Sequence, residues 1–408
     1  MARLVSTRWE SDVTSGLPRR DRGGCRYEAY VPDPLAGRSF SLDGPVAADV
    51  ADAEKAIQRL DSEADSLLDT EAVGRLLLRA ESVASSHIEG LEVGGRRLLR
   101  AEAAKALGVA PEDVTAEEVL GNIEAMTWAV RNLASAEVVT VDGLLEIHRR
   151  LLKGTRLQRH AGEIRVTQNW IGGSSYNPCS AAFVPPPPEE VLPLLDDLCS
   201  FSNGDDLPAV AQAAIAHAQF ETIHPFADGN GRTGRALIHV ILRRRGLAGR
   251  VLVPVSLVLA TRAGDYIAGL TAMRYVGRSD SKLAIEGHNE WVGTFATACR
   301  RAVDDALQFE DQIKEIQEAW TAALGRVRRN SAVHILIGAL PGAPIVTVNS
   351  AAQLIDRSFV QTNEAIARLQ SAGVLRPISV GRRNRAFEAP AAIEAFTDLE
   401  RQLAGQEA

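Results

Sequence analysis

The twelve residues 224–235, HPFADGNGRTGR, constrain the fold of this chain more than any other stretch. The proline after His224 disfavours the α region for that histidine, so the helical pattern over 207–222 has to end at or before it. The first two glycines allow unusual backbone angles and the close approach of a ligand. A second helical pattern covers 230–245. The stretch therefore predicts a tight loop between two helices, with the N–H groups of the second helix pointing back at the loop.

The side chains in this loop suit the binding of a phosphate chain. A helix N-terminus attracts anions, and Arg232 and Arg235 are three residues apart, so they share one helix face. Asp228 offers the hard oxygen ligand that Mg²⁺ needs when it bridges phosphates, and His224 can accept a proton near neutral pH. A bare DGNG would more often be a simple turn, but this set in one register favours phosphoryl or nucleotidyl transfer. It is neither a P-loop nor a Rossmann turn, because no G-x-x-x-x-G-K-[ST] is present and a helix precedes the loop.

The periodicity along the 408 residues predicts a mainly α-helical protein in three parts. We expect an N-terminal arm and helical extension over 1–95, a helical core over 96–328 and a separate C-terminal unit over 329–408. The arm, up to about residue 45, has the composition of an irregular, extended segment. Further helices are predicted at 46–87, 99–107, 116–134, 141–153, from about 189, and over most of 256–327, with Thr115 and Thr140 as caps of two of them. Short β-prone runs in 162–184 predict a β-hairpin or flap.

The last eighty residues have a different pattern. It predicts a helix at 331–340, a short strand at 345–348, a helix capped by Asn349 or Ser350, a turn at 359–362, a helix at 363–373 and a strand–turn–strand at 374–390. This order is that of a winged helix-turn-helix. The wing is basic, but the helix at 363–373 offers few side chains for base edges, so a protein contact is favoured over a DNA contact. The basic wing residues are Arg376, Arg382, Arg383 and Arg385.

Composition excludes several classes of protein. A net charge of −7 argues against a protein that coats nucleic acid or an anionic membrane along its whole surface. The four cysteines are scattered without a C-x-x-C pair, so neither a zinc site nor a disulfide framework is expected, and a reducing compartment fits. The N-terminus lacks the apolar core of a signal peptide, and no run of about 18 apolar residues appears. We therefore expect a cytoplasmic protein without a membrane segment.

HPFADGNGRTGR resembles the signature of the Fic family, His-Pro-Phe-x-(Asp/Glu)-Gly-Asn-Gly-Arg-x-x-Arg, at every defined position. AHAQFETI before it, GEIRVTQNWIGG and FVPPPP some forty to sixty residues earlier, and YVPDPL near the start are also similar to larger Fic proteins. Those proteins have an N-terminal helical extension and a C-terminal winged helix, and the resemblance runs from about Tyr27 to the end. It implies a Fic-type helical core and protein adenylylation (AMPylation), in which AMP moves from Mg²⁺-bound ATP to a hydroxyl of a target protein.

The resemblance also implies roles for individual residues. His224 would be the base, Asp228 would hold Mg²⁺, and Arg235 would take the γ-phosphate. The flap would align the target segment, and Tyr266 would lie near the adenosine, although Ile267 stands where the family often has a second tyrosine and Tyr266 could simply be a core aromatic. The nucleotide-binding residues implied are Ile171, Gly172, Gly173, Ser174, Gly229, Asn230, Gly231, Arg232, Thr233, Gly234, Arg235 and Tyr266. His217, two turns before His224, is expected to be a packed, hydrogen-bonded histidine rather than a catalytic one.

A second motif, SSHIEG at 85–90, points at the first. Glu89 lies at a helix C-terminus, where a carboxylate is electrostatically disfavoured, so it needs a cationic partner. The motif, with Ser85, Glu89 and Gly90, resembles the inhibitory Ser/Thr-x-x-x-Glu-Gly/Asn motif of Fic proteins. The resemblance implies that Glu89 pairs with Arg235 and withholds it from ATP. The same glutamate could orient a water, so de-AMPylation stays open beside AMPylation and self-modification.

Two hypotheses from different classes remain. One is an autoinhibited adenylyltransferase that acts on a Ser, Thr or Tyr hydroxyl of a target protein. The other is a DNA-binding transcription regulator whose Fic core senses nucleotide. Intact His224 and Asp228 favour the enzyme, because a sensor needs neither a base nor a metal ligand. A homodimer is compatible with either hypothesis.

Overall fold

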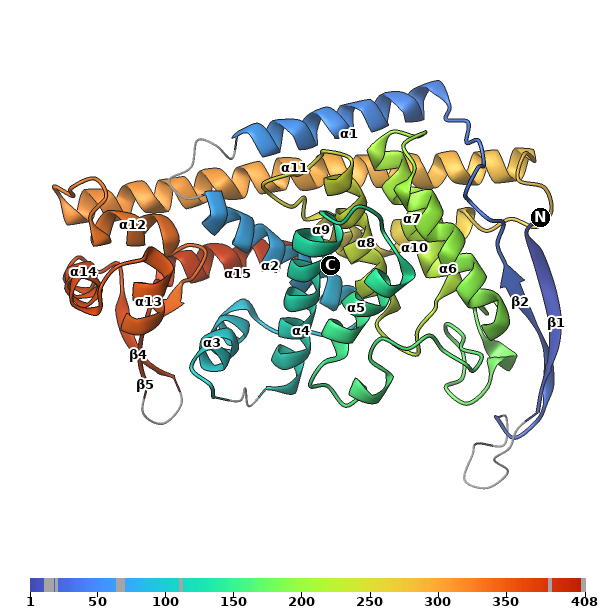
Figure 1. The fold of residues 1–408 in the computed structure, drawn as a ribbon, viewed down its shortest axis with the longest axis horizontal. Helices are drawn as coiled ribbons and strands as arrows, with labels where there is room; N and C mark the ends of the chain where they lie inside the picture. Colours follow the sequence, from blue (N-terminus) through green and yellow to red (C-terminus); the bar gives the residue numbers. More distant parts are fainter. Residues whose placement is uncertain (11–17, 19–20, 64–69, 110–112, 381–383, 405–408) are drawn as a thin grey trace.

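The computed structural model describes residues 1–10, 18, 21–63, 70–109, 113–380 and 384–404. The longest element described is the 43-residue helix α11, Lys282–Leu324, which runs along the length of the molecule (Figure 1). Helix α1, Gly44–Glu63, lies along α11 through its buried face of Val50, Ala53, Ile57 and Leu60. Within the described segments, no helix has both the length and the apolar character needed to cross a membrane.

The centre of the molecule is the antiparallel pair α7, Ala209–Ile223, and α8, Asn230–Arg244. Every residue of α7 is buried, which its alanine-rich composition permits because small side chains let neighbouring helices approach on all sides. Helix α2, Thr70–Ile88, packs against α8, and both α1 and α11 pack against α7. Helices α9, Val255–Thr261, and α10, Ala263–Ala272, pack against α11, and α9 also packs against α2. The mainly helical core predicted from the sequence is confirmed.

The remaining core helices follow the sequence prediction closely, with one wrong cap. They are α3 at Gly95–Ala106, α4 at Val114–Trp128, α5 at Val141–Leu152 and α6 at Pro188–Asn203, with a π-helical turn over Ala129–Leu133. Thr140 caps α5 as expected, but α4 is capped by Asp113, two residues before Thr115. Asp is as good an N-cap as Thr, so position rather than residue type decided between them.

Part of the N-terminal arm forms a regular hairpin, which corrects the prediction of an irregular segment for residues 3–9 and 25–31, while residues 32–43 are irregular as expected. Strands β1, Arg3–Trp9, and β2, Cys25–Val31, pair antiparallel along their whole length, from Arg3 opposite Val31 to Trp9 opposite Cys25. Exposed and half-buried side chains alternate in β1 and in the first half of β2, which matches the period of a strand, but the Gly and Pro residues nearby outweighed this signal. This hairpin lies at one end of the molecule (Figure 1).

The expectation of no disulfide is also wrong. Cys25 at the start of β2 is bonded to Cys179, which is 154 residues away in the sequence. Sequence spacing could not reveal this pair, because only the tertiary fold brings the two segments together. The scattered cysteines therefore no longer support a reducing compartment. Cys199 and Cys299 are buried free thiols.

The flap has less regular structure than predicted. Between residues 162 and 184, all of which the structure describes, the only strand-like pairing is a single antiparallel bridge between Ile171 and Phe183. A short 3-10 helix at Pro178–Ser180 closes the segment, and the prolines at 185–188 lead into α6. The predicted hairpin is thus an irregular loop with one bridge.

The C-terminal unit has the element order predicted for a winged helix-turn-helix. It contains α12 at Ala332–Ala339, β3 at Ile345–Val346, α13 at Val348–Ile355, α14 at Phe359–Ser371, β4 at Arg376–Val380 and β5 at Asn384–Glu388, and the sheet order is β3-β5-β4. Two details correct the prediction: Thr347 caps α13, and Ser358 caps α14, so 359–362 is the first turn of a helix. Arg382 and Arg383 lie outside the described residues.

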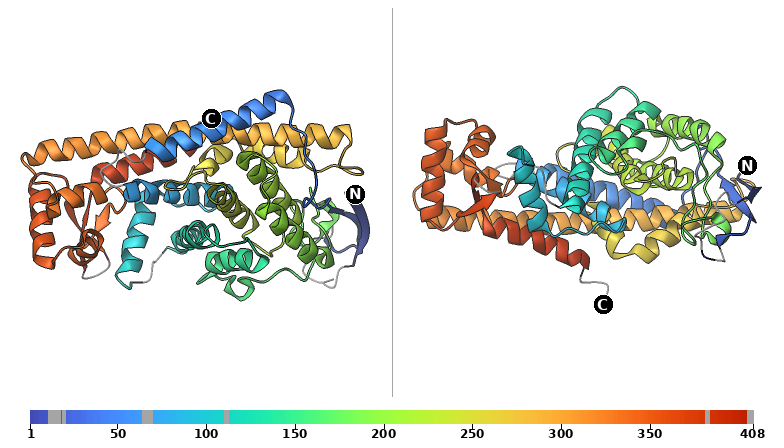
Figure 2. Two further views of the ribbon diagram at one scale, coloured as in Figure 1. Left: turned by 45° about the horizontal axis from the view of Figure 1, so that its top comes forward. Right: turned by 90° about the horizontal axis from the view of Figure 1, so that it is seen from below.

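A final helix that the sequence analysis did not single out, α15 at Pro390–Ala404, returns from this unit along α11 (Figure 2). It packs against α2, α3 and α9, so the C-terminal unit is tied to the core. The proposed boundaries near 95 and 328 stay predictions.

Candidate active site

The loop between α7 and α8 has the backbone that its sequence predicts. His224 ends α7 in the left-handed conformation, with φ 50° and ψ 60°, and its N–H donates to the Phe220 carbonyl. Gly229, with φ 77°, sits at the N-cap position of α8. The left-handed region is unusual for histidine, so the surrounding contacts must hold it there.

Two side chains lock the inside of this loop. The Asn230 Oδ1 atom accepts a hydrogen bond from the Phe226 N–H at 2.8 Å, and its Nδ2 donates to the Phe226 carbonyl at 2.9 Å. His148 of α5 accepts from the Gly162 N–H at Nδ1, which leaves Nε2 to donate to the Asp228 carbonyl at 3.0 Å. Its ring also stacks on Phe226. The Asn230 side chain, predicted to bind nucleotide, is therefore occupied in the loop, and only its backbone N–H lies at the start of α8.

Two residues of GEIRVTQNWIGG, not singled out from the sequence, hold the catalytic histidine candidate from the other side. Arg165 Nε donates to the His224 carbonyl at 2.9 Å, and Asn169 Nδ2 donates to the carbonyls of His224 and Phe226 at 3.2 and 3.0 Å. Arg165 is 6% exposed and also reaches the Pro186 carbonyl. Its only signal in the sequence is a cation inside a β-prone run.

His224 is in the protonation state that a base requires. Burial lowers the pKa of His224 to about 4, although the negative charge of Glu89 and the Glu221 carbonyl act in the opposite direction. The imidazole is therefore neutral at physiological pH and can accept a proton.

Asp228 and Arg232 lie at the open end of α8. The Asp228 side chain is 47% exposed, while that of Arg232 is 5% exposed, and their closest charged atoms, Oδ1 and Nη2, are 3.6 Å apart. Asp228 Oδ1 also accepts from the Gly229 N–H. One accessible carboxylate beside an anion-binding helix end fits Mg²⁺, which is commonly held by one or two carboxylates together with substrate phosphates. In the described parts of the chain, no cluster of three or more His, Cys, Asp or Glu forms an all-protein metal site.

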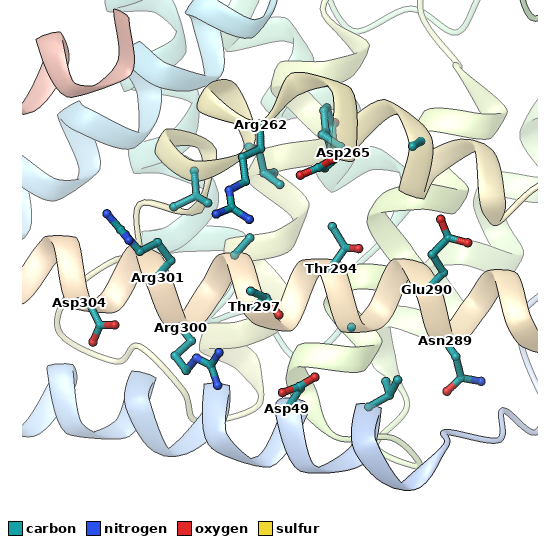
Figure 3. Close-up of a pocket in the computed structure, with 17 residues that line it drawn as sticks. Asp49, Arg262, Asp265, Asn289, Glu290, Thr294, Thr297, Arg300, Arg301 and Asp304 are labelled. Carbon is teal, nitrogen blue, oxygen red and sulfur yellow. The ribbon is translucent and has the colours of Figure 1, made fainter. Parts of the chain in front are cut away.

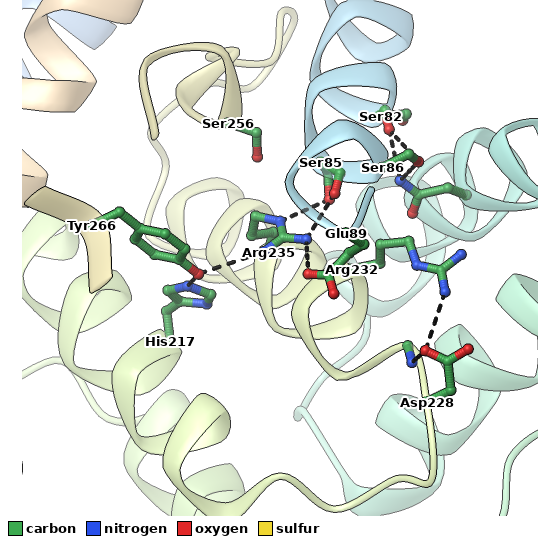
Figure 4. Close-up of polar contacts among 12 residues, drawn as sticks. Ser82, Ser85, Ser86, Glu89, His217, Asp228, Arg232, Arg235, Ser256 and Tyr266 are labelled. Atoms are coloured by element: carbon green, nitrogen blue, oxygen red, sulfur yellow. Dashed lines mark hydrogen bonds and ion pairs between the residues drawn. The ribbon is translucent and has the colours of Figure 1, made fainter. Parts of the chain in front are cut away.

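Arg235 is held by the last turn of α2 (Figure 4). Its Nη2 donates to Glu89 Oε1 at 2.6 Å and to the Ser85 carbonyl at 2.8 Å, and its Nε donates to Ser85 Oγ at 2.8 Å. The predicted Glu89–Arg235 contact is thus present. Gly90, with φ 77°, ends the helix directly after Glu89.

Charge explains why this contact is stable. Burial disfavours both ions, but the guanidinium of Arg235 outweighs it and lowers the pKa of Glu89. In turn, the Glu89 carboxylate outweighs the effect of burial and raises the pKa of Arg235. The Arg235 side chain is 1% exposed and that of Glu89 is 33% exposed, so the arginine is the partner that most needs the pair.

Gly231 makes room for this ion pair. A Cβ atom at Gly231 would overlap Glu89 Oε1 and would lie 2.8 Å from Arg235 Nη1. The Glu89 carboxylate therefore rests directly on the first turn of α8, where the open N–H groups of the helix favour negative charge.

Helix α2 is fixed by polar contacts on two other faces. Glu81 accepts from His239 Nε2 at 2.8 Å and from both the N–H and the hydroxyl of Ser256. Asn122 of α4 donates to the Ser82 carbonyl and to Ser86 Oγ. These buried contacts determine where Glu89 is presented.

Tyr266 lies behind Arg235. Its hydroxyl is 2.8 Å from His217 Nε2 and accepts from Arg235 Nη1 at 3.5 Å. His217 is fully buried, as expected for a packed histidine, and burial lowers its pKa to about 3. Glu221 is also buried, and its Oε1 has no hydrogen-bond partner among the described residues; burial raises its pKa to about 7.

The other residues predicted to bind nucleotide have different surroundings. Thr233 is completely buried in α8, and a Cβ atom at Gly234 would lie 2.8 Å from Glu221 Oε1, so Gly234 permits the close contact of α7 and α8. Ile171, Gly172, Gly173 and Ser174 form the flap and its turn. The link from the flap to the loop is Asn169, two residues before Ile171.

One cavity is separate from the loop. It has a volume of about 690 Å³, lies between α1, α9, α10 and α11, and is lined in part by Tyr266 (Figure 3). Its wall carries both signs of charge, including Arg262, Asp265, Glu290, Arg300 and Asp304. No residue of 224–235 lines it.

Comparison with protein families agrees with this geometry. Residues 138–242 match the model of the Fic/DOC family, and residues 47–131 match the model of the N-terminal part of that family. The segment that matches the Fic/DOC model contains the loop, Arg165 and the flap, and the segment that matches the N-terminal model contains Glu89.

Individual relatives match over part of their length. The chain is 33% identical over 196 residues to protein adenylyltransferase fic-1 of Caenorhabditis briggsae, and 32% identical over 204 residues to protein adenylyltransferase Fic of Culex quinquefasciatus. These alignments cover 46% and 47% of the chain but only 36% and 39% of the relatives. The fold is similar to the crystal structure of a Fic family protein from Desulfovibrio desulfuricans, with a TM-score of 0.54 at 22% identity, covering 86% of this chain and 97% of that one.

Proposed function

We propose that this chain is an autoinhibited protein adenylyltransferase that moves AMP from ATP to a Ser, Thr or Tyr hydroxyl of a target protein. The observation that carries the proposal is the loop at the start of α8 within the Fic domain. It brings a neutral histidine, an exposed carboxylate and a helix N-terminus together, and Glu89 lies against them. The adenylyltransferase names of the relatives support the same activity.

In the proposed reaction, the target hydroxyl attacks the α-phosphorus of ATP, and His224 takes the hydroxyl proton. The bond to the β-phosphate oxygen breaks and pyrophosphate leaves. The N–H groups at the start of α8 and the guanidinium of Arg232 stabilise the negative charge on the phosphates. Mg²⁺, held by Asp228 together with the phosphates, would neutralise part of that charge when bound. Arg165 and Asn169 act as positioning residues, because they hold the His224 backbone.

The Glu89–Arg235 pair is the proposed brake. Arg235 is the cation best placed on α8 to receive the end of the triphosphate, and Glu89 and Ser85 already occupy its donors. ATP that binds beside an occupied Arg235 would have its α-phosphate out of line with the incoming hydroxyl. Adenylylation would therefore be slow until Glu89 leaves. The Glu89→Gly variant also tests whether this carboxylate orients a water for de-AMPylation, because the variant should then no longer remove AMP.

The test uses intact-mass analysis after incubation with Mg-ATP, because self-modification needs no known target. Glu89→Gly should increase the addition of AMP by about 10-fold or more, since a factor of ten corresponds to only about 1.4 kcal/mol of alignment. His224→Ala in the Glu89→Gly background should abolish the addition. Glu92→Gly is the matched control, because Glu92 is an exposed glutamate three residues away whose side chain is 80% exposed.

The result separates the two parts of the proposal. No AMP on any variant, with or without candidate target proteins, would exclude adenylylation. Equal labelling of the wild type and Glu89→Gly would exclude autoinhibition by Glu89 and leave the proposed adenylyltransferase activity standing.

For the C-terminal unit we propose a protein contact rather than a DNA contact. Two of its arginines are already engaged: Arg368 donates to the Leu324 and Arg326 carbonyls, and Arg376 pairs with the buried Glu388. The start of α14 instead exposes Phe359 and Val360. Apolar side chains at this position suit a protein surface better than a phosphate backbone. A gel shift with DNA that weakens with salt would contradict this proposal.

A further inference from the structure

The flap is attached to the N-terminal hairpin by a covalent bond. Cys25, the first residue of β2, is bonded to Cys179 in the 3-10 helix Pro178–Ser180. The hairpin ends at residue 31, before either segment that matches the Fic family models begins. An element outside the matched segments is therefore tied directly to the part of the Fic domain that borders the site.

Non-covalent contacts join the same two elements. Asn177 Nδ2 donates to the Asp21 carbonyl at 3.2 Å, and the Tyr30 N–H donates to the Val184 carbonyl at 2.9 Å. Trp9 packs edge-on against Trp170, with ring centroids 5.4 Å apart. The hairpin therefore contacts the flap at its beginning, at its middle and at its end.

The position of Cys179 connects this attachment to the turn of the flap. The next residue, Ser180, accepts a hydrogen bond at Oγ from the Ser174 N–H at 3.1 Å, and its carbonyl packs against Gly173. Two residues further on, the Ala182 N–H donates to the Ile171 carbonyl at 2.9 Å. Beyond a single β-bridge and a few hydrogen bonds within the flap, residues 171–174 rest largely on the bonded Cys179–Ser180 segment.

One end of the bond is an exposed residue, unlike the other two cysteines. Cys179 is exposed and Cys25 is half-buried, whereas Cys199 and Cys299 are buried thiols. Burial raises the pKa of Cys199 to about 12 and also raises that of Cys299, so neither forms a thiolate readily. A soluble thiol reagent can therefore act on one site selectively.

We propose that the Cys25–Cys179 disulfide is a redox-sensitive staple that holds the flap in its ordered position, so that reduction loosens the flap and weakens target docking. A dithiol reductant would supply the two electrons: one thiolate attacks the sulfur of Cys179, an exposed residue, and Cys25 leaves as a thiolate. The second thiol of the reductant then attacks the mixed disulfide, which releases Cys179 and leaves the reductant oxidised. The docking part of this proposal rests on the proposed adenylyltransferase function, and the ordering of the flap does not.

Hydrogen exchange measured by mass spectrometry tests the ordering directly. Full-length protein purified without reductant is compared with the same protein in excess dithiothreitol, and with the reduced protein after reoxidation. We expect backbone exchange in 170–184 to become about 10-fold faster on reduction and to recover on reoxidation, because a local anchor is lost and restored. Exchange in α7 and α8 should stay the same and serves as the internal reference.

Three variants separate the bond from the reagent. Cys25→Ser/Cys179→Ser should resemble the reduced protein and should no longer respond to dithiothreitol, while Cys199→Ser should respond like the wild type. Unchanged exchange in 170–184 upon reduction would overturn the proposal. So would mass spectrometry that finds Cys25 and Cys179 as free thiols after oxidant treatment.

The docking part is measured in the Glu89→Gly background with a protein target that it labels. Reduction should raise the KM for that target about 3- to 10-fold and should leave the KM for ATP unchanged, because the flap holds the target segment. An unchanged KM for the target would overturn the docking part. Failure of the adenylyltransferase proposal itself would appear differently, as no labelling in either redox state, with the exchange result still readable.

Discussion

The loop before α8 and the flap both belong to the candidate site, but they are held in place in different ways. The loop is held by hydrogen bonds, from Asn230 to Phe226 within it and from His148, Arg165 and Asn169 of neighbouring segments to its carbonyls. The flap has one β-bridge of its own and is held by a covalent bond, from Cys179 to the N-terminal hairpin. This difference suggests a division of labour, in which the loop proposed to perform the chemistry is fixed and the flap proposed to meet the target can be adjusted.

The largest effect should come from removing the main fastening of the loop. Arg165→Met keeps the length of the side chain but removes the donor to the buried Pro186 carbonyl and one of the two donors to the His224 carbonyl. We expect a loss of about 3 kcal/mol of stability, since such groups are costly to leave unpaired, and a fall in labelling of about 100-fold from misplacement of His224. Differential scanning calorimetry and AMP labelling in the Glu89→Gly background measure the two effects.

Arg159→Met is the control for this substitution, because Arg159 is an exposed arginine six residues earlier whose Nε donates to the neighbouring His160 side chain. Equal melting temperatures for Arg165→Met and the wild type would show that the loop does not depend on this arginine.

A matched pair of glycine substitutions should sharpen the comparison. Gly229 and Gly173 have φ angles of 77° and 75°, so alanine is strained at both. Gly229→Ala would also press against Leu151 in the core, and we expect about 1–2 kcal/mol of lost stability together with lost labelling. Gly173→Ala would press against Ser180 in the exposed flap, and we expect a much smaller change in melting temperature with faster hydrogen exchange in 170–184. The comparison fails if both variants lower the melting temperature equally.

The smallest effect concerns pH. The pKa of His224 is lowered to about 4, so His224 should remain an unprotonated base between about pH 5 and 8, where a normal histidine would lose activity below about pH 6.5. Removing Glu89 takes away a charge that raises this pKa, so the Glu89→Gly variant should be even less sensitive to acid. Initial labelling rates across this range should show no acid limb near pH 6.5.

Glu221 provides the control for this measurement, because burial raises its pKa to about 7 and it is buried close to Arg235 and His224. A change near pH 7 that disappears in Glu221→Gln belongs to that carboxyl. One that persists would show that His224 titrates normally.

Local sequence determined those features in which neighbouring residues settle the backbone. The His-Pro step and Gly229 set the end of α7 and the start of α8, and the spacing of Ser85, Glu89 and Gly90 placed the carboxylate at a helix end. The helical periodicity predicted the bounds of the core helices to within a few residues, because an apolar stripe indicates a buried helix face whichever element it packs against. The prediction for the N-terminal arm was wrong because the Gly and Pro residues near its ends outweighed the seven-residue alternation that indicates a strand.

Only the tertiary structure decided which distant groups meet. Arg165 and Asn169 act on His224 across some 55 residues, Cys25 bonds to Cys179 across 154, and Arg235 meets Glu89 across 146. No local propensity encodes such distances, since they depend on how whole helices pack. Glu89 and Arg235 could be predicted as partners from the sequence because each needs an opposite charge. The contacts of Arg165 with carbonyls and the Cys25–Cys179 bond, by contrast, become visible only in the folded chain.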